Sequence, residues 1–237
     1  MSIIDKYSVK PINNLDYKDW LLHKHYAKRI PSISYAMGLY DDKYILQGCV
    51  CYGRPMAHTL VQNAFQGEYQ EDFLELNRLV INEGLEKNVL SFLVSKSIKM
   101  LPKPQVIVSY ADTSHNHHGY IYQATNWYYS GLSEKFSDYM VKGYEHLHSS
   151  SIMDMVGRSD GVDGHINKVE LLKKKFGEEN IYMVERPQKH RYFYFLGDKK
   201  QVKNMKSKIK YPQQPYPKGD NQRYDASYKP STQGILF

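Results

Sequence analysis

The stretch from Val106 to Tyr129 constrains the fold more than any other part of the sequence. It opens with the apolar run Val106–Val108, which predicts a buried strand, and then breaks into a polar turn that holds Asp112 and a cluster of histidines. After Gly119, apolar residues return at close to helical spacing. In open α/β sheets, ligands bind beyond the carboxyl ends of strands. The sequence therefore predicts a functional site around Asp112.

The order of the predicted elements indicates the fold class. Strands alternate with helices after the first hairpin, which is typical of an α/β (α+β) fold with a mixed, partly parallel central sheet flanked by helices. Residues 131–151 lack apolar periodicity and are predicted to form a surface loop. The predicted strands are Tyr7–Ile12, Ser34–Tyr40, Tyr44–Tyr52, Phe73–Ile81, Val106–Ala111, Trp127–Ser130, Ile181–Val184 and Arg191–Leu196. The predicted helices end near Tyr26, span Asn88–Leu101 and run from Asp163 to Gly177.

The strand Phe73–Ile81 contains an unusual set of polar residues. Simple alternation along the strand places Glu75 and Asn77 on one face and Arg78 on the other. A charge inside a sheet is costly unless it is paired or used. We therefore expect this strand to contribute to a site.

The net charge of +7 is placed unevenly along the chain. From Pro187 to Phe237 there are 11 Lys and Arg against 3 Asp. A basic segment on a near-neutral body predicts a polyanionic partner, most simply nucleic acid, although a solvated tail that aids solubility has the same composition. The Pro-, Tyr- and Gln-rich sequence from Tyr211 predicts an extended or disordered tail. We accordingly divide the chain into a folded domain, residues 1–200, and a basic extension, residues 201–237.

The cysteines and the apolar runs exclude several classes of protein. Cys49 and Cys51 alternate on a predicted strand, where buried thiols are more common than a disulfide or a metal site, and this fits a reducing cytoplasm. No apolar run approaches the length that spans a membrane, and the N-terminus lacks the core of a signal peptide. We expect a cytoplasmic protein with no membrane partner.

Three polar clusters could converge on one site. They are His25 and Tyr26 with Arg29, Glu75 with Asn77 or Arg78, and Asp112 with His115, His117, His118 and Tyr122. Two chemistries compete for such a set. Histidine and carboxylate side chains bind divalent metals such as non-haem iron. Alternatively, Asp112 or His25 is a general base and Tyr122 a general acid.

The helix that begins at Asn88 offers a further site. The free N–H groups and the positive dipole end of its first turn would suit a phosphate or pyrophosphate group. No Gly-x-Gly signature precedes the helix, so an ordinary capped core helix is the alternative.

Eight short motifs are spread over most of the chain. They are His25-Tyr26-Ala27-Lys28-Arg29-Ile30-Pro31, Glu75-Leu76-Asn77-Arg78, Ser91-Phe92-Leu93-Val94-Ser95, Ser109-Tyr110-Ala111-Asp112, Gly119-Tyr120-Ile121-Tyr122-Gln123-Ala124-Thr125-Asn126, Tyr129-Ser130-Gly131, Lys189-His190-Arg191-Tyr192 and Tyr216-Pro217-Lys218. With these motifs the sequence resembles the Mom family of phage DNA adenine-modification proteins. The resemblance runs from about Trp20 to Lys218 and is densest between Glu75 and Gly131.

The resemblance implies a variant of the GNAT acetyltransferase fold. It implies that adenine N6 in duplex DNA is converted to a carbamoylmethyl (acetamido) derivative, which protects phage DNA from host restriction enzymes. It also implies acetyl-CoA and iron (Fe2+) as cofactors, double-stranded DNA as partner, and a phage-encoded protein in the bacterial cytoplasm. A homodimer is compatible with the sequence.

The resemblance also assigns roles to residues. The implied catalytic residues are His25, Tyr26, Arg78, Asp112 and Tyr122. The implied cofactor-binding residues are Asn88 and Ser91, with the CoA pyrophosphate at the start of that helix. The implied metal ligands are His25, Asp112 and His118. In the basic region from Lys189 onward, the predicted DNA-binding residues are Lys189, His190, Arg191, Lys208, Lys210 and Lys218.

Two departures from the family pattern bear on these roles. Residues 82–87 lack the glycine-rich pyrophosphate loop of ordinary GNAT enzymes, and Ala27-Lys28 stands where relatives often have Leu-His. Two other functions therefore stay open: a conventional acetyl-CoA-dependent N-acetyltransferase acting on a small amine or protein, and a DNA-binding protein without enzymatic activity.

Overall fold

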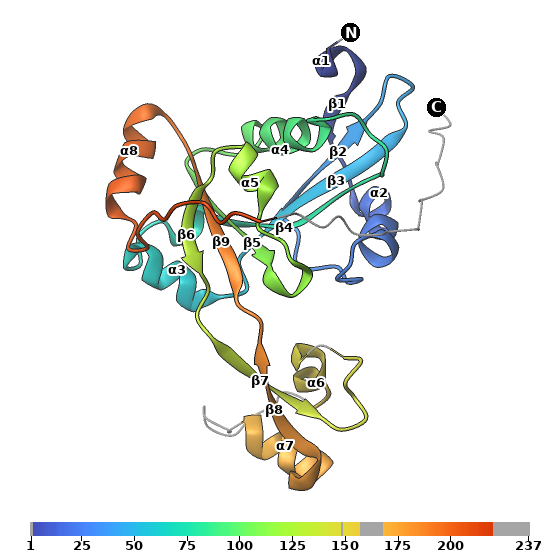
Figure 1. Ribbon diagram of the computed structural model, residues 1–237, viewed down its shortest axis with the longest axis vertical. Helices are drawn as coiled ribbons and strands as arrows, with labels where there is room; N and C mark the ends of the chain where they lie inside the picture. Colours follow the sequence, from blue (N-terminus) through green and yellow to red (C-terminus); the bar gives the residue numbers. More distant parts are fainter. Residues whose placement is uncertain (1, 148, 157–167, 220–237) are drawn as a thin grey trace. The chain divides into compact units, whose positions relative to one another are not determined.

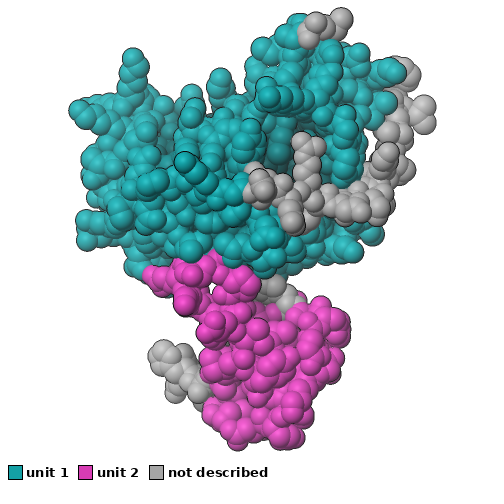
Figure 2. Space-filling view, in the orientation of Figure 1, with its two compact units in different colours: residues 1–132, 189–237 teal, residues 133–188 magenta. Residues whose placement is uncertain are grey.

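The chain divides into two compact units (Figures 1 and 2). The structure is a computed structural model that describes residues 2–147, 149–156 and 168–219. Unit 1 comprises residues 1–132 and 189–237, and unit 2 comprises residues 133–188. Unit 2 is therefore an insertion between two strands of unit 1. The predicted division into residues 1–200 and 201–237 is a different one and stays a prediction.

Unit 1 is built on a seven-stranded sheet with the strand order β1-β2-β3-β4-β5-β9-β6. The pair β4–β5 is parallel, and the other neighbouring pairs are antiparallel. The predicted mixed, partly parallel sheet is confirmed. The strands are β1 (Ser8–Pro11), β2 (Tyr35–Tyr40), β3 (Leu46–Gly53), β4 (Phe73–Ile81), β5 (Gln105–Asp112), β6 (Tyr128–Leu132) and β9 (Lys189–Leu196).

Helices cover both faces of this sheet (Figure 1). On one face, α4 (Val89–Lys99) and α5 (Tyr120–Ala124) enclose the largest apolar cluster. On the other face, α3 (His58–Phe65) and α8 (Lys199–Lys208) enclose a second cluster. The remaining elements of unit 1 are α1 (Ile3–Lys6), α2 (Asn14–Asp19) with the π-helical turn η1 (Trp20–Lys24), and the 3-10 turns η2 (Gln70–Asp72) and η3 (Thr113–His115). Within the described residues, no helix is long and apolar enough to cross a membrane.

The helix α4 forms as its apolar stripe predicts. Leu93, Val94 and Ile98 recur on one side of the helix and are fully or almost fully buried against the sheet. Asn88 occupies the N-cap position with a left-handed backbone, φ 71°, and its side chain makes no capping hydrogen bond. The helix begins where expected, but the Asn88 side chain is not what caps it.

A bulge in β4 changes which side chains share a face. Gly53 and Cys51 lie on one face of β3 because they are two residues apart, and their partners across the ladder are Glu75 and Arg78. These partners are three residues apart, so β4 carries one extra residue, at the irregularity opposite Cys51–Tyr52. Glu75 and Arg78 therefore lie on the same face. The expectation that they lie on opposite faces is wrong, because simple alternation does not allow for a bulge.

Unit 2 is a two-stranded ribbon with two helices at one end. The strands β7 (Phe136–Val141) and β8 (Ile181–Arg186) are antiparallel, and α6 (Ser149–Met155), α7 (Lys168–Phe176) and the 3-10 turn η4 (Glu178–Asn180) complete the unit. Val141, Ile152 and Leu172 form its small core. The prediction of a surface loop over residues 131–151 is wrong for β7, because only the distal end of this strand is packed and the sequence shows no alternation. The predicted cap Asp163 lies outside the described residues.

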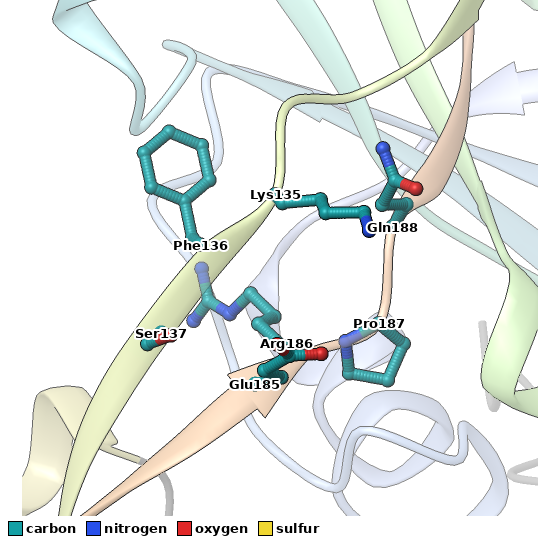
Figure 3. A pocket seen from close by; sticks show the side chains of 7 residues that line it. All are labelled: Lys135, Phe136, Ser137, Glu185, Arg186, Pro187 and Gln188. Atoms are coloured by element: carbon teal, nitrogen blue, oxygen red, sulfur yellow. The ribbon is translucent and has the colours of Figure 1, made fainter.

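A shallow pocket of about 280 Å³ lies at the open end of this ribbon. Figure 3 shows the Lys135 side chain extending toward Gln188, while the Phe136 ring projects away from it. Arg186 forms an ion pair with Asp138 at 2.9 Å. None of the predicted site residues lines this pocket.

The C-terminal segment is more ordered than its composition predicts. Lys199–Lys208 form the helix α8, which the sequence did not predict, and residues 209–219 continue as an extended strap along unit 1. The backbone N–H of Gln214 donates to the Tyr129 carbonyl at 2.9 Å, and the Tyr216 hydroxyl donates to the Trp127 carbonyl at 2.6 Å. The strap is extended, as expected, but it is packed. The predictions for residues 220–237 lie outside the described residues.

Candidate active site

The candidate site lies where β4 and β5 stop pairing. The parallel ladder between them ends at Glu75 and Val108. Beyond this point the Ser109 hydroxyl donates to the Leu76 carbonyl at 2.8 Å and lies 2.7 Å from the Tyr122 hydroxyl. A carbonyl can only accept and serine has one hydroxyl proton, so Tyr122 donates its own proton to Ser109. Ser109 thus links both strands to α5.

Tyr122 is buried and protonated. Burial raises the pKa of Tyr122 well above its ordinary value. The phenol therefore keeps its proton at neutral pH. This state is the one that a general acid needs, and the predicted role of Tyr122 stays a prediction.

Asp112 ends β5 with its carboxylate already engaged. One oxygen accepts from the backbone N–H of Ser114 at 3.0 Å and from its hydroxyl at 2.6 Å. The other oxygen forms an ion pair with Lys189 at 3.2 Å. Burial raises the pKa of Asp112, but the bonds from Ser114 and the charge of Lys189 outweigh this, and the pKa lies below its ordinary value. The carboxylate is a poor proton acceptor in this setting and is well placed to fix β9 and the η3 turn.

His25 follows the π-helical turn η1 and is buried as a neutral ring. Burial, together with the charge of Arg78, lowers the pKa of His25 to about 3. Its Nδ1 atom accepts from the Ala27 backbone N–H at 3.1 Å. This bond assigns the proton of the neutral ring to Nε2. His25 therefore offers a hydrogen-bond donor to the site rather than a base or a free lone pair.

Tyr26 carries an aromatic surface next to His25. The two rings are stacked with centroids 4.5 Å apart, and the ring of His115 meets Tyr26 edge-on at 5.1 Å. Tyr26 is 41% exposed. The structure thus brings the N-terminal His-Tyr pair and the histidine turn after β5 together, as the sequence predicts.

Arg78 and Glu75 are two ionisable side chains on one face of β4. The Arg78 guanidinium donates from Nε and Nη2 to the Arg29 carbonyl at 3.3 Å each, and from Nη1 to the Asn77 carbonyl at 2.5 Å. Burial lowers the pKa of Arg78 and raises the pKa of Glu75. A hydrogen bond from the Met56 backbone and the charge of Arg78 offset part of the Glu75 shift. Glu75 is therefore the carboxylate of this face whose proton affinity is increased.

The predicted cofactor-binding residues lie at the start of α4. Ser91 donates from its hydroxyl to the Asn88 carbonyl at 2.9 Å, and Asn88 is exposed. The first N–H of this 11-residue helix, that of Val89, donates to the Glu86 carbonyl at 3.3 Å. The cofactor-binding role of Asn88 and Ser91 stays a prediction.

The predicted metal ligands are not gathered. Among the described residues, no three His, Cys, Asp or Glu side chains form a group that could hold a metal ion. His118 lies beside His190, with ring centroids 5.7 Å apart, whereas Asp112 is paired with Lys189 and His25 accepts a backbone bond. The described residues do not bring His25, Asp112 and His118 together as one group, and their role as metal ligands stays a prediction.

The predicted DNA-binding residues fall into two groups. His190 and Arg191 are buried, His190 against the Tyr129 hydroxyl at 2.7 Å, and Arg191 over the Tyr211 ring at 3.7 Å. Lys189 pairs with Asp112. The other three are exposed lysines of α8 and the strap, namely Lys208, Lys210 and Lys218. The DNA-binding role of all six residues stays a prediction. The three exposed lysines are better suited to this role than the three buried or paired residues.

Two residues of the site were not among the predicted catalytic residues. Ser109 sits directly after the apolar run of β5, and an isolated hydroxyl in such a position is a signal that sequence reasoning can use. Glu75 stands out in the sequence as a polar residue in a strand, and the bulge in β4 places it on the same face as Arg78.

The comparisons with known proteins agree with the motifs in the sequence. The model of the Mom protein family matches residues 6–218. This chain belongs to the Mom protein family. A relative in that family is the methylcarbamoylase Mom of Escherichia phage Mu, 25% identical over 201 residues, which cover 82% of this chain and 77% of the relative. The family match includes unit 2 and the strap as far as Lys218.

Two solved structures show a distant similarity to this Mom family member. Arabidopsis thaliana NAA60 in complex with acetyl-CoA has a TM-score of 0.42 and 10% identity, over 80% of this chain and 98% of that one. A GNAT family N-acetyltransferase (YhbS) from Escherichia coli in complex with CoA has a TM-score of 0.37 and 13% identity, over 54% and 71%. At these scores the similarity carries no functional weight.

Proposed function

We propose that this Mom family member modifies adenine N6 in duplex DNA to a carbamoylmethyl derivative and thereby protects phage DNA from host restriction. The observation that carries the proposal is the family match over residues 6–218, shared with a phage methylcarbamoylase. The protein would act in the cytoplasm of the bacterial host, where the phage DNA is exposed to restriction enzymes.

The aromatic surface of Tyr26 is suited to the target base. The N6 amine of a paired adenine is not accessible to an enzyme, so the base has to leave the duplex. A flipped base is held by stacking on aromatic rings and by hydrogen bonds to its edge. The stacked His25–Tyr26 pair and the nearby ring of His115 offer such a surface, and His25 Nε2–H adds a donor.

Glu75 is the best candidate for accepting the N6 proton. It lies on the face of Arg78, and burial raises the pKa of its carboxyl, which makes its carboxylate a stronger base than that of Asp112. General bases act best when their pKa approaches the working pH. Tyr122, protonated and bonded to Ser109, would serve as the acid at the end of β5.

Acetyl-CoA is the proposed cofactor. Asn88 and Ser91 at the start of α4 would hold its pyrophosphate, since helix N-termini favour phosphate groups. For iron, the described residues offer no three-ligand group, so no step of the reaction is assigned to the metal.

Restriction digestion gives a first test of the proposal. Plasmid DNA from cells that express the protein should resist enzymes whose sites contain the modified adenine, and should be cut normally by enzymes whose sites lack adenine. DNA from cells that express Tyr122→Phe at the same level is the matched control and should be cut by both. Full cleavage of the wild-type DNA by every enzyme tried would contradict the proposal.

A further inference from the structure

The positive charge of the protein is carried by unit 1. Unit 2 contains eight Lys and Arg against ten Asp and Glu, a formal charge of −2 within a total of +7. The excess of positive charge therefore belongs to residues 1–132 and 189–237, and α8 is its densest described part. A polyanion would be attracted to unit 1 rather than to unit 2.

The helix α8 is firmly attached to unit 1. Asp198 and Gln201 form a reciprocal capping box at its start, with both hydrogen bonds at 2.8 Å. Met205 is fully buried in the apolar cluster under the helix, and Asn204 donates to the Tyr69 hydroxyl at 2.5 Å. The lysines of α8 therefore project from a fixed backbone.

Three of these lysines lie along one side of the helix. Lys199, Lys203 and Lys206 have the spacing i, i+4, i+7, which places them in one row. All three are exposed, and with Gly197 and Val202 they line a shallow hollow of about 440 Å³. We refer to Lys199, Lys203 and Lys206 as the lysine row.

The lysine row lacks acidic partners. No Asp or Glu of the described residues forms an ion pair with any of its members, whereas Lys208 on the same helix pairs with Glu68 at 2.6 Å. Like charges at this spacing destabilise a helix by a few tenths of a kcal/mol per pair. If the row faced only solvent, the repulsion between its lysines would destabilise the helix without compensation. A bound polyanion would neutralise the three charges and remove the repulsion.

We propose that the lysine row binds successive phosphates of the DNA strand that flanks the modified adenine. The row spans about 10 Å along the helix axis, since each residue rises about 1.5 Å. Phosphates of one DNA strand advance about 3.4 Å per nucleotide along the duplex axis and lie further apart than this along the strand, so the row has the length of two to three neighbouring phosphates. Lysine ammonium groups bind phosphates as point charges, which gives affinity without sequence preference. This inference rests on the proposed function for its choice of DNA as the polyanion.

The test compares DNA binding of two triple variants over a range of salt concentrations. The first is Lys199→Gln, Lys203→Gln, Lys206→Gln, and glutamine is chosen because its helix propensity is close to that of lysine. The control is Lys135→Gln, Lys142→Gln, Lys174→Gln, which removes the same charge from exposed positions of unit 2. Fluorescence anisotropy with a labelled duplex measures the affinity, and circular dichroism confirms that each variant is folded.

The first variant should reduce the salt dependence of binding. Each lost phosphate contact lowers the slope of log affinity against log salt by about 0.9, so the slope should fall by about 3 and binding at low salt should weaken more than 10-fold. The control should keep the slope and affinity of the wild type to within about 3-fold. An unchanged slope in the first variant, or an equal loss in the control, would overturn the proposal.

The binding assay uses no cofactor, so its outcome is separate from that of the proposed reaction. A wild-type protein that binds DNA through the lysine row but leaves adenine unmodified would refute the proposed function alone. A folded first variant that binds DNA like the wild type, while the wild type modifies adenine, would refute the lysine row alone. A wild-type protein that does not bind duplex DNA would refute both.

Discussion

Replacing Asp112 separates a positioning role from a catalytic one. Asp112→Asn keeps an oxygen that can accept from Ser114 but removes the charge that pairs with Lys189. Asp112→Ala removes both interactions. If the carboxylate positions η3 and β9, the two variants should differ in stability, and Asp112→Asn should retain the reaction.

The magnitudes follow from the two interactions. Loss of a capping acceptor costs about 1 kcal/mol. The ion pair contributes at most about 1 kcal/mol, because the Lys189 side chain is 37% exposed and solvent screens the pair. Asp112→Ala should therefore lower the free energy of unfolding by about 2 kcal/mol and Asp112→Asn by about 1 kcal/mol. For a chain of this size these losses correspond to drops in Tm of about 4–8 °C and 2–4 °C.

The pH dependence gives a second measurement on the same variants. The pKa of Asp112 is lower in the folded protein than in the unfolded chain, so its charge stabilises the fold above the ordinary pKa of about 4. This contribution is lost as the pH falls below that value. The Tm difference between the wild type and Asp112→Asn should therefore be constant near neutral pH and shrink in acid.

The assays are thermal melts followed by circular dichroism and adenine modification measured at matched protein levels. Asp112→Asn should retain modification to within about 10-fold, less than the 100-fold or more that loss of a general base costs. Complete loss of modification in Asp112→Asn, with melting unchanged, would refute the positioning role and support Asp112 as a base.

Three further variants test the other groups of the site. Glu75→Gln should lower modification about 100-fold or more and leave the stability of the fold unchanged or higher. The rate of the wild type should rise with pH as Glu75 loses its proton, and the variant should lack this rise. A variant with the pH profile of the wild type would show that Glu75 is not the base. Tyr122→Phe should abolish modification while Tm falls by only a few degrees, because Ser109 keeps its bond to β4; full activity would remove Tyr122 from the reaction. Arg191→Ala should lower the free energy of unfolding by about 2–3 kcal/mol, because it removes packing on Tyr211 and a buried hydrogen bond to Ser130. The salt dependence of DNA binding should stay unchanged. A changed slope of log affinity against log salt, at unchanged stability, would indicate that Arg191 contacts a phosphate directly.

Local pattern was sufficient to predict most of the sheet and its longest core helix. The apolar stripe of Leu93, Val94 and Ile98 and the apolar run of β5 each reflect burial on one face or on both, so the sequence carries the signal directly. Unit 2 was harder to predict, because its ribbon is packed only at one end. The helix α8 was missed because its lysines obscure an apolar side that consists mainly of Val202 and Met205.

The sequence predicted that several of these side chains lie near one another, but not the contacts that set their chemistry. The motifs bring His25, Tyr26, Arg78 and Asp112 to the same part of the sheet, as expected. Their chemistry depends on contacts that no motif encodes. The Ala27 backbone N–H fixes the tautomer of His25, and Lys189 forms an ion pair with Asp112. The β4 bulge places Glu75 on the same face as Arg78.

Mass analysis of nucleosides tests the central claim most directly. Genomic and plasmid DNA would be isolated from cells that express the wild type or Tyr122→Phe, digested to nucleosides and separated. The wild type should yield a modified deoxyadenosine that carries a carbamoylmethyl group, heavier by one NH than an acetylated adenine, and Tyr122→Phe should yield none. Adenine that stays unmodified in cells expressing soluble wild-type protein, or that carries only an acetyl group, would contradict the proposed function.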